Sequence, residues 1–438
     1  MIINGVSFLS KDINTAWDKL DNTALLFPVI ASENMTNVYR IFAVMTEEVD
    51  RVLLQEALNR VLPHFSVFRM CLRAGLFWYY FEENKKTTPQ VRQEYAYPGA
   101  YINKSQNHNY MFRVTYYGRR INLEVFHVLT DGFGGIVFLK ELVYQYLRLK
   151  YPEALAGEKD RISPDVYFDK EDSYLKNYKK PVKERKKYKS SHAVTLHGEK
   201  LMGGAVGVIQ GSMRIDLLKA ACKKYGVTIN QYLVGAYTYA IYKGYLHSRG
   251  SDVPIACCVP VNLRPFYDSH TMKNFFAMVT AEFQPQERIE KYSFAEVLEI
   301  TTQSLKEQIT KENLDDIITY NVSNEQNFIL RLIPLAIKNI AIKQVYEASR
   351  HNSTTTITNI GNIELREPYK PFVENFACLL SMSAGQNMKG SVCSYNGILT
   401  VCFSSILSDT SVQKCFFQTL TEDGVEVVLQ TNEVYEDA

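Results

Sequence analysis

The chain has almost no net charge and no strong excess of either sign. Its 438 residues carry 49 lysines and arginines against 47 aspartates and glutamates, which leaves a formal charge of +2. A protein that binds nucleic acid through its phosphates usually presents a large excess of positive charge. The composition therefore gives no reason to expect a nucleic-acid partner.

The eight cysteines include no Cys-x-x-Cys pair. Closely spaced cysteines and histidines are typical of zinc sites, and regularly spaced cysteines of small disulfide-linked domains. Cys257 and Cys258 are adjacent, but they lie in an apolar run that is typical of a strand. We therefore expect no metal site, and free thiols as in a reducing cytosol, so we predict a cytoplasmic protein.

Segments that direct a chain into a membrane are also lacking. Residues 1–12 contain no basic region followed by an apolar core, so they do not predict an ordinary secretory signal. The longest stretch without charge, residues 390–408, contains Asn396-Gly397 and several serines. It predicts a β-hairpin rather than a transmembrane span, and peripheral contact with a membrane stays open.

The most informative stretch that is present runs from His127 to Gly132. Residues 121–126 before it alternate apolar and polar side chains, which places His127 at the end of a strand. Glycines at 132, 134 and 135 let the chain turn before a helix-like apolar pattern begins at Ile136. A histidine at such a corner can project into a cleft, while Asp131 can fix the corner or pair with an arginine.

Neutral imidazole suits the removal of a proton from a hydroxyl or amine that attacks a thioester carbonyl. The pKa of an unperturbed histidine is about 6.5, so the ring is mostly unprotonated at neutral pH. Such a base needs neither a metal nor a covalent intermediate. A histidine at a strand end is also often a plain hydrogen-bonded residue, so the predicted strand, turn and helix around it carry the argument.

His127, Asp131 and Gly132 resemble the HxxxDG signature of the chloramphenicol-acetyltransferase-like superfamily of CoA-dependent acyltransferases. That superfamily includes alcohol acetyltransferases, plant-type and polyketide-associated acyltransferases, and the condensation domains of nonribosomal peptide synthetases. The resemblance implies that His127 is the general base and that Asp131 is mainly structural. It also implies two similar lobes, each a mixed β-sheet with helices, with an active-site tunnel at their interface.

Residues 259–265 and 274–276 are similar to a second landmark of these enzymes, an arginine-containing loop before a strand. By this resemblance Arg264 is the expected structural partner of Asp131, and Asn274 is a candidate substrate-binding residue. An exposed, solvated arginine is the plain alternative, although a buried aspartate needs a compensating charge or hydrogen bonds to stay ionised. Two departures are clear: Phe126 stands where condensation domains usually carry a first histidine, and the DFGWG motif of plant-type enzymes is absent.

Length and periodicity predict an α/β protein of two domains, with hydrophobic residues at 46% and charged residues at 22%, as in average soluble proteins. We expect an N-terminal lobe in residues 1–175 with the motif, a basic linker in 176–200, and a C-terminal lobe in 201–438. Between residues 176 and 189 the basic side chains oppose only Glu184, and they are Lys176, Lys179, Lys180, Lys183, Arg185, Lys186, Lys187 and Lys189. A solvated linker face is the usual meaning of such a run. The alternatives are attraction of CoA phosphates, an acidic carrier protein or an anionic membrane surface.

Apolar patterns predict the individual elements. Expected strands lie at 38–45, 76–81, 111–117, 121–128, 205–213, 253–261, 275–283, 354–360 and 375–383. Expected helices lie at 47–62, 136–150, 216–224, 228–245, 294–308, 328–347 and 410–420.

These features together predict an acyltransferase without a bound cofactor. The acyl group would move from an acyl thioester, either acyl-CoA or acyl-phosphopantetheine, to an alcohol, with His127 as general base. The alternatives are an amide-forming condensation or N-acyltransfer to an amine from a carrier-bound acyl group, and a non-catalytic protein that only binds a carrier. An acyl-carrier protein is thus a possible partner.

Overall fold

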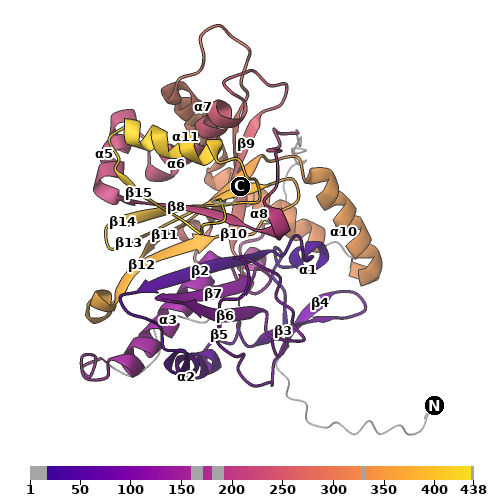
Figure 1. The fold of residues 1–438 in the computed structure, drawn as a ribbon. Coiled ribbons are helices and arrows are strands. Elements are labelled where there is room, and N and C mark those ends of the chain that lie inside the picture. Colours follow the sequence, from indigo (N-terminus) through magenta and orange to yellow (C-terminus); the bar gives the residue numbers. More distant parts are fainter. Residues whose placement is uncertain (1–16, 159–170, 180–191, 327–330, 436–438) are drawn as a thin grey trace, which may run out of the picture.

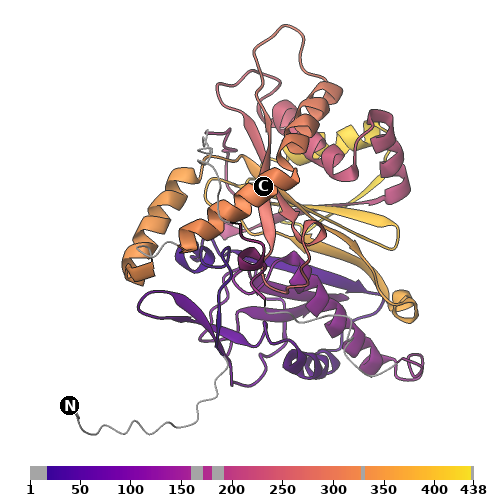
Figure 2. The same cartoon turned by 180° about the vertical axis from the view of Figure 1, so that it is seen from behind.

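The computed structural model describes residues 17–158, 171–179, 192–326 and 331–435. They form two lobes, each a β-sheet with helices (Figures 1 and 2). The first lobe lies in the lower half of Figure 1 on a five-stranded sheet, and the second lobe lies above it on a seven-stranded sheet. The predicted α/β class with two mixed sheets is confirmed.

The sheet of the first lobe delivers the motif histidine. Its strand order is β12 (Val373–Leu379), β2 (Val38–Met45), β7 (Arg120–Phe126), β6 (Phe112–Tyr117) and β5 (Arg92–Gln93). Neighbours pair antiparallel, except that β5 and β6 are parallel. β6 and β7 form a hairpin that turns at Gly118, where φ is +53°. The second arm of this hairpin ends at Phe126, so His127 is the first residue beyond the strand.

Two helices, α2 (Arg51–Val61) and α3 (Gly132–Lys150), lie side by side below this sheet (Figure 1). Each begins after an aspartate whose side chain accepts backbone N–H groups of the first turn: Asp50 for α2 and Asp131 for α3. Such caps satisfy donors that have no partner within the helix. The aspartate of the motif therefore fixes where α3 starts.

A smaller antiparallel sheet completes the first lobe. Its strand order is β1 (Trp17–Lys19), β4 (Tyr79–Glu83) and β3 (Met70–Ala74). The short helix α1 (Phe27–Ile30) follows β1 and contacts α10 (Leu335–Ser349) of the second lobe.

The sheet of the second lobe mixes parallel and antiparallel pairs. Its strand order is β10 (Phe276–Phe283), β9 (Ile255–Asn262), β11 (Thr355–Ile363), β13 (Met388–Tyr395), β14 (Ile398–Ser405), β8 (Gly207–Arg214) and β15 (Val427–Thr431). β11 runs parallel to β9 and β13, and the other pairs are antiparallel. Asn396 and Gly397 connect β13 to β14 with φ of +46° and +79°. Positive φ at both positions is what a two-residue hairpin turn needs, and the predicted hairpin is confirmed.

Helices cover the outer face of this sheet, at the top of Figure 1. They are α5 (Ile215–Tyr225), α6 (Ile229–Ala240), α7 (Phe294–Gln308) and α11 (Ser411–Glu422). α6 continues into a π-helical turn, Ile241–Tyr245. The remaining described helices are α4 (Ser173–Lys176), α8 (Lys311–Gln326) and α10, and the last two lie on the opposite side of the molecule from α5 (Figure 2).

Strand β12 lies at the seam between the two lobes. It comes from the C-terminal half of the sequence, yet it pairs with β2 in the first sheet. Phe376 and Cys378 belong to the core of the first lobe, whereas Ala377 and Leu379 pack with Cys402 of the second sheet. The strand is buried on both faces, so the expectation that residues 201–438 all belong to the C-terminal lobe does not describe it.

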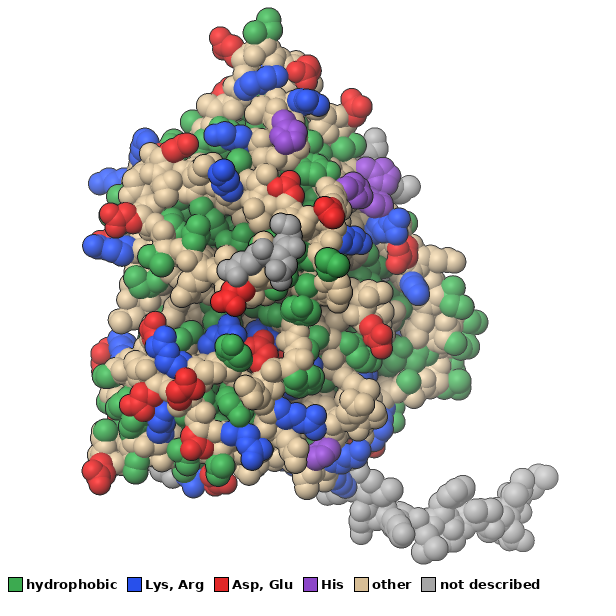
Figure 3. Space-filling view, in the orientation of Figure 1, with side chains coloured by type: hydrophobic (Ala, Val, Ile, Leu, Met, Phe, Trp, Pro, Cys, Tyr) green, Lys and Arg blue, Asp and Glu red, His purple; other side chains and the backbone are tan. Residues whose placement is uncertain are grey.

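Most predicted elements are present within a few residues, and the helix at 294–308 has its predicted bounds. The sequence patterns missed the short strands β1, β3, β5 and β15, the one-turn helices α1 and α4, and the helix α8. Of the predicted linker 176–200, residues 180–191 lie outside the described residues, so the domain boundaries stay a prediction. No helix among the described residues is long and apolar enough to cross a membrane. Basic and acidic side chains are interspersed over the face in Figure 3.

Candidate active site

His127 occupies the corner between β7 and α3, where the seam of the two lobes begins. Its backbone N–H donates to the carbonyl of Asn37 at 2.9 Å, which ties the corner to the segment before β2. The side chain remains partly exposed, whereas the preceding Phe126 and following Val128 are buried. The histidine is therefore fixed by its backbone and is less completely buried than its two neighbours.

Three aromatic rings hold the imidazole. Phe27 of α1 stacks on it with a centroid distance of 4.7 Å and an angle of 22°. Tyr39 of β2 meets it edge-on at 5.1 Å, and Phe276 of β10 lies at 5.7 Å. Rings from both lobes thus limit the orientations open to the imidazole.

Asn274 sets the orientation and the tautomer of the imidazole. Its amide oxygen lies 2.9 Å from Nδ1 of His127. Its amide nitrogen donates to Oδ2 of Asp21 at 3.0 Å, and its backbone N–H donates to the same oxygen at 3.2 Å. The backbone N–H of Asn274 can only donate, so Oδ2 of Asp21 acts as an acceptor and turns the amide nitrogen toward itself and the amide oxygen toward His127. Nδ1 must then carry the proton, which leaves the lone pair of Nε2 free to accept one.

The surroundings of His127 favour its neutral form. Burial lowers the pKa of the imidazole, and the positive charge of Lys389 lowers it further, while Asp131 and the bond to Asn274 act in the opposite direction. A neutral imidazole is the form that can act as a base. Burial also raises the pKa of the Asp21 carboxyl to about 7, although the hydrogen bond from Asn274 opposes this rise.

Asp131 points away from the imidazole and toward the second lobe. Oδ1 accepts the backbone N–H groups of Phe133 at 3.1 Å and Gly134 at 3.3 Å, and Oδ2 accepts that of Phe275 at 3.0 Å. Arg264 donates to both oxygens, with Nη1 at 2.8 Å from Oδ2 and Nη2 at 3.3 Å from Oδ1. The structure thus brings together the aspartate and the arginine that the resemblance paired.

Arg264 is held on all sides at this junction. Its guanidinium donates to the carbonyl oxygen of Thr271 through Nε and Nη2, at 3.0 and 2.9 Å, and to that of Lys273 at 2.7 Å. It also lies 4.4 Å from the centre of the Phe133 ring. The side chains of Arg264 and Asp131 are only 7% and 9% exposed. A buried, bidentate ion pair therefore joins the start of α3 to the loop before β10.

Two glycines of the corner have different surroundings. A Cβ on Gly132 would meet only the side chain of Ile360, at 3.5 Å, which is an ordinary contact. A Cβ on Gly134 would lie 2.0 Å from Oγ1 of Thr130 and 2.8 Å from the carbonyl oxygen of Met272. Close packing thus requires glycine at 134, while the space at Gly132 borders the second lobe.

Three parts of the site escaped the sequence reasoning: Asp21, Tyr39 and Phe27. Asp21 is 1% exposed and also accepts the N–H of Ala24 at 2.8 Å. Tyr39 donates from its hydroxyl to the carbonyl of Asp131 at 2.8 Å. An acidic residue among apolar ones, as in residues 20–26, was the available signal for Asp21, but nothing in the sequence placed it beside residue 274.

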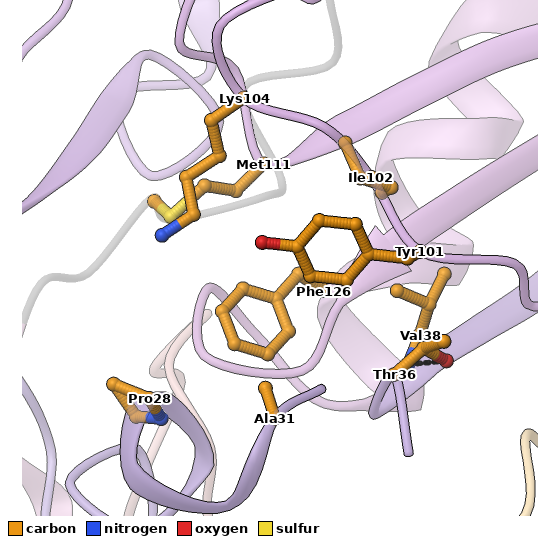
Figure 4. A pocket seen from close by; sticks show the side chains of 9 residues that line it. All are labelled: Pro28, Ala31, Thr36, Val38, Tyr101, Ile102, Lys104, Met111 and Phe126. Carbon is orange, nitrogen blue, oxygen red and sulfur yellow. Dashed lines mark hydrogen bonds between the residues drawn. The ribbon is translucent and has the colours of Figure 1, made fainter. Parts of the chain in front are cut away.

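A small cavity lies next to the site in the first lobe. Its volume is about 80 Å³, and it borders Phe126, the neighbour of His127 (Figure 4). The other lining residues are Pro28, Ala31, Thr36, Val38, Tyr101, Ile102, Lys104 and Met111. Figure 4 shows Lys104 extending over this cavity, and burial lowers the pKa of its amine. Across the described ranges, no group of histidine, cysteine and carboxylate side chains is arranged to hold a metal ion.

The arrangement of lobes is that of condensation domains and related acyltransferase-like proteins. One similar structure is polyketide synthase associated protein 5 from Mycobacterium tuberculosis, with 15% identity and a TM-score of 0.55, covering 92% of this chain and 97% of the other. Another is the condensation domain from the Monacolin K polyketide synthase MokA, with 11% identity and a TM-score of 0.56, covering 93% and 96%.

A third similar structure is the starter condensation domain of rhizomide synthetase, determined as a mutant in complex with C8-CoA and Leu-SNAC. It shares 10% identity and a TM-score of 0.57, and the match covers 93% of each chain. No protein-family model matches the chain, and no curated protein matches it by sequence. At these identities the likeness establishes the fold.

Proposed function

We propose that the protein transfers an acyl group from an acyl thioester to a hydroxyl acceptor, with His127 as general base. The observation that carries this proposal is the hydrogen bond between Nδ1 of His127 and the amide oxygen of Asn274. It leaves Nε2 as a proton acceptor in a ring whose pKa is lowered. A neutral base that is already oriented is what attack on a thioester requires.

The reaction follows from this geometry. Nε2 takes the proton of the acceptor hydroxyl as its oxygen attacks the thioester carbonyl carbon. The tetrahedral intermediate then expels the thiolate, and the imidazolium returns the proton to the sulfur. The ester and the free thiol are the products, and His127 ends the cycle neutral.

Asp131 and Gly132 support the base in this proposal. The carboxylate of Asp131 holds the first turn of α3 and pairs with Arg264, so it fixes the corner without touching the imidazole. Gly132 leaves space beside the seam for a substrate. Asn274 acts as a positioning residue for His127, in place of the substrate contact that we expected from the resemblance.

The donor in this proposal carries its acyl group on CoA or on the phosphopantetheine arm of a carrier protein. The complex of the rhizomide synthetase domain with C8-CoA supports a thioester donor in a fold of this kind. The similar structures include parts of polyketide synthases and nonribosomal peptide synthetases, which favours a carrier protein as partner. We place the reaction in the cytosol because the eight cysteines are free in the structure and suit a reducing compartment.

Amide formation is the second candidate, since Leu-SNAC in the same complex presents an amine. An amine attacks a thioester with the same base, so the geometry at His127 serves both acceptors. Phe126 in place of the first histidine of condensation domains favours the alcohol. A protein that only binds a carrier needs no oriented base, and the hydrogen bond that His127 donates to Asn274 argues against it.

A thiol-release assay tests the proposal. Acyl-CoA and acyl-N-acetylcysteamine donors of several chain lengths are incubated with the protein and with panels of alcohols and amines. We expect thiol release that depends on an acceptor, with the ester or amide identified by mass spectrometry. Release that never depends on an acceptor would make the protein a hydrolase, and no release with any donor would contradict acyl transfer.

A further inference from the structure

Lys389 is a buried cation on the face of β13 that looks toward the first lobe. Side chains alternate along this strand, and Met388 and Val392 lie in the core of the second lobe. Lys389 and Ser391 therefore point the other way. Ser391 confirms this direction, because its hydroxyl donates to the carbonyl of Cys378 in β12, the strand at the seam.

The ammonium of Lys389 has no carboxylate partner among the described residues. The residue is 8% exposed, and the hydrogen bond found for Nζ goes to the hydroxyl of Ser383. The other buried cations each pair with a carboxylate: Arg40 and Arg113 with Glu124, and Lys273 with Asp18. A charge buried without a counter-charge is costly, so Lys389 is exceptional among the buried cations of the described ranges.

The environment of Lys389 is polar but neutral. Gln386, beside the Ser383 hydroxyl in the same turn, accepts a hydrogen bond from Oγ1 of Thr356 on β11 at 2.8 Å. Thr356 in turn is opposite Cys258 on β9. Burial lowers the pKa of the lysine to about 8, so the amine is still mostly protonated at neutral pH. An ammonium offers three donors, and the hydrogen bond to Ser383 uses one of them.

Lys389 also acts on the catalytic corner, because its charge is among those that lower the pKa of His127. The turn that contains Ser383 also lies beside the segment that holds His127: the backbone N–H of Ala384 lies 3.3 Å from Sδ of Met35, and the carbonyl of Asn37, two residues later, accepts the N–H of His127. A group bound by this amine would therefore lie on the His127 side of the seam. The phosphates of CoA or of a phosphopantetheine arm lie at the far end of the pantetheine chain from the sulfur. An anion near the reacting carbon must belong to the acyl group or to the acceptor.

We propose that Lys389 is the counter-ion for a carboxylate carried by a substrate, on either the acyl group or the acceptor. This inference rests on the proposed acyl transfer, and it names the substrate class: an acidic acyl thioester or a hydroxy acid. The carboxylate of the substrate provides the negative charge that no described side chain provides to Lys389. The hydroxyl of Ser383 accepts a hydrogen bond from the amine and so holds it in place.

Binding measurements test this proposal separately from catalysis. The first pair of probes is the succinyl thioester of N-acetylcysteamine and its methyl ester, and the second is 3-hydroxybutyrate and its methyl ester. Each probe is titrated alone into the protein, by calorimetry at neutral pH. No second substrate is present, so no acyl transfer can occur. We expect the acid of one pair to bind at least about tenfold more tightly than its ester, as for a charge-assisted hydrogen bond. The pair that shows the preference identifies the substrate that carries the carboxylate.

Charge removal provides the decisive comparison. Lys389→Met should abolish the preference for the acid, and Lys389→Gln, which keeps a donor for Ser383, should do the same. Lys414→Met, at an exposed lysine of α11, should retain it. Equal binding of acid and ester by the wild type in both pairs, or a preference that survives in a folded Lys389 variant, would overturn the proposal. Failure of acyl transfer would leave these binding results intact, so the two proposals fail separately.

Discussion

The amide oxygen of Asn274 lies 2.9 Å from Nδ1 of His127, across the seam between the lobes. The histidine follows β7 of the first lobe, and the asparagine precedes β10 of the second. Asp21 fixes the amide from behind through two hydrogen bonds to its Oδ2. The tautomer of His127 is therefore set by a residue of the other lobe.

Asn274→Ala should lower the rate of transfer while the protein stays folded. Without the amide oxygen, Nδ1 loses its acceptor and the imidazole can carry its proton on Nε2 instead. We expect a smaller loss than the roughly 10²- to 10⁴-fold effect of removing the base itself. The ¹⁵N chemical shifts of His127 should report a mixture of tautomers, which a purely structural role would not produce. Unchanged shifts and an unchanged rate would contradict the positioning role.

The ion pair between Asp131 and Arg264 should show strong coupling in stability. Asp131→Ala should destabilise by roughly 3 to 5 kcal/mol, because it leaves the shielded guanidinium without its counter-charge. Asp131→Asn should be milder, since an amide oxygen can still cap α3. The measurement is a double-mutant cycle with Arg264→Ala, followed by thermal or denaturant unfolding. A coupling energy of zero would mean that Asp131 and Arg264 contribute to the free energy of unfolding independently of each other.

Asp21 should make stability depend on pH in a defined window. Its pKa is raised from 3.8 to about 7 in the folded protein, so the folded state binds this proton more tightly than the unfolded state. The corresponding stability is fully present below pH 3.8 and is lost as the pH rises through 7, by on the order of 4 kcal/mol. Asp21→Asn does not titrate, so its stability should lack this dependence on pH. The check is the difference in unfolding free energy between wild type and variant, measured across this window; a difference independent of pH would refute it.

Alanine at Gly134 should lower stability, whereas alanine at Gly132 should leave stability nearly unchanged and lower activity. Gly134→Ala places a methyl group against Oγ1 of Thr130 and the carbonyl of Met272, and should cost about 1 to 3 kcal/mol or more. Gly132→Ala meets only the side chain of Ile360, so its stability should stay within about 1 kcal/mol of wild type. Transfer by Gly132→Ala should nevertheless fall if substrate uses this space. Equal melting temperatures for both variants would show that the corner tolerates the added methyl group.

The corner itself could be predicted because its signals are local. Alternation before His127, three glycines after it and an apolar helix pattern define strand, turn and helix within about thirty residues, the size of one supersecondary unit. The proximity of Arg264 to Asp131 came from the resemblance rather than from the periodicity. The oriented Asn274 was expected as a substrate contact, since sequence does not reveal which way an amide points.

The parts that could not be predicted depend on pairings between distant segments. The paired residues of β12 and β2 are 328 or more positions apart in the sequence. The alternation of apolar and polar side chains in β12 does not indicate which sheet the strand joins. Asp21 and Asn274 are separated by 253 positions and meet only because the segment after β1 folds against the loop before β10. The short strands at the sheet edges carry too few residues for a clear period.

Acyl transfer by wild-type protein and by His127→Ala, compared with the same donor and acceptor, tests the central claim most directly. The account predicts that the variant melts at nearly the wild-type temperature and that its rate falls by about 10² to 10⁴. Thiol release should fall in parallel with ester formation. A folded His127→Ala protein that transfers the acyl group as fast as wild type would contradict the assignment of His127 as the base.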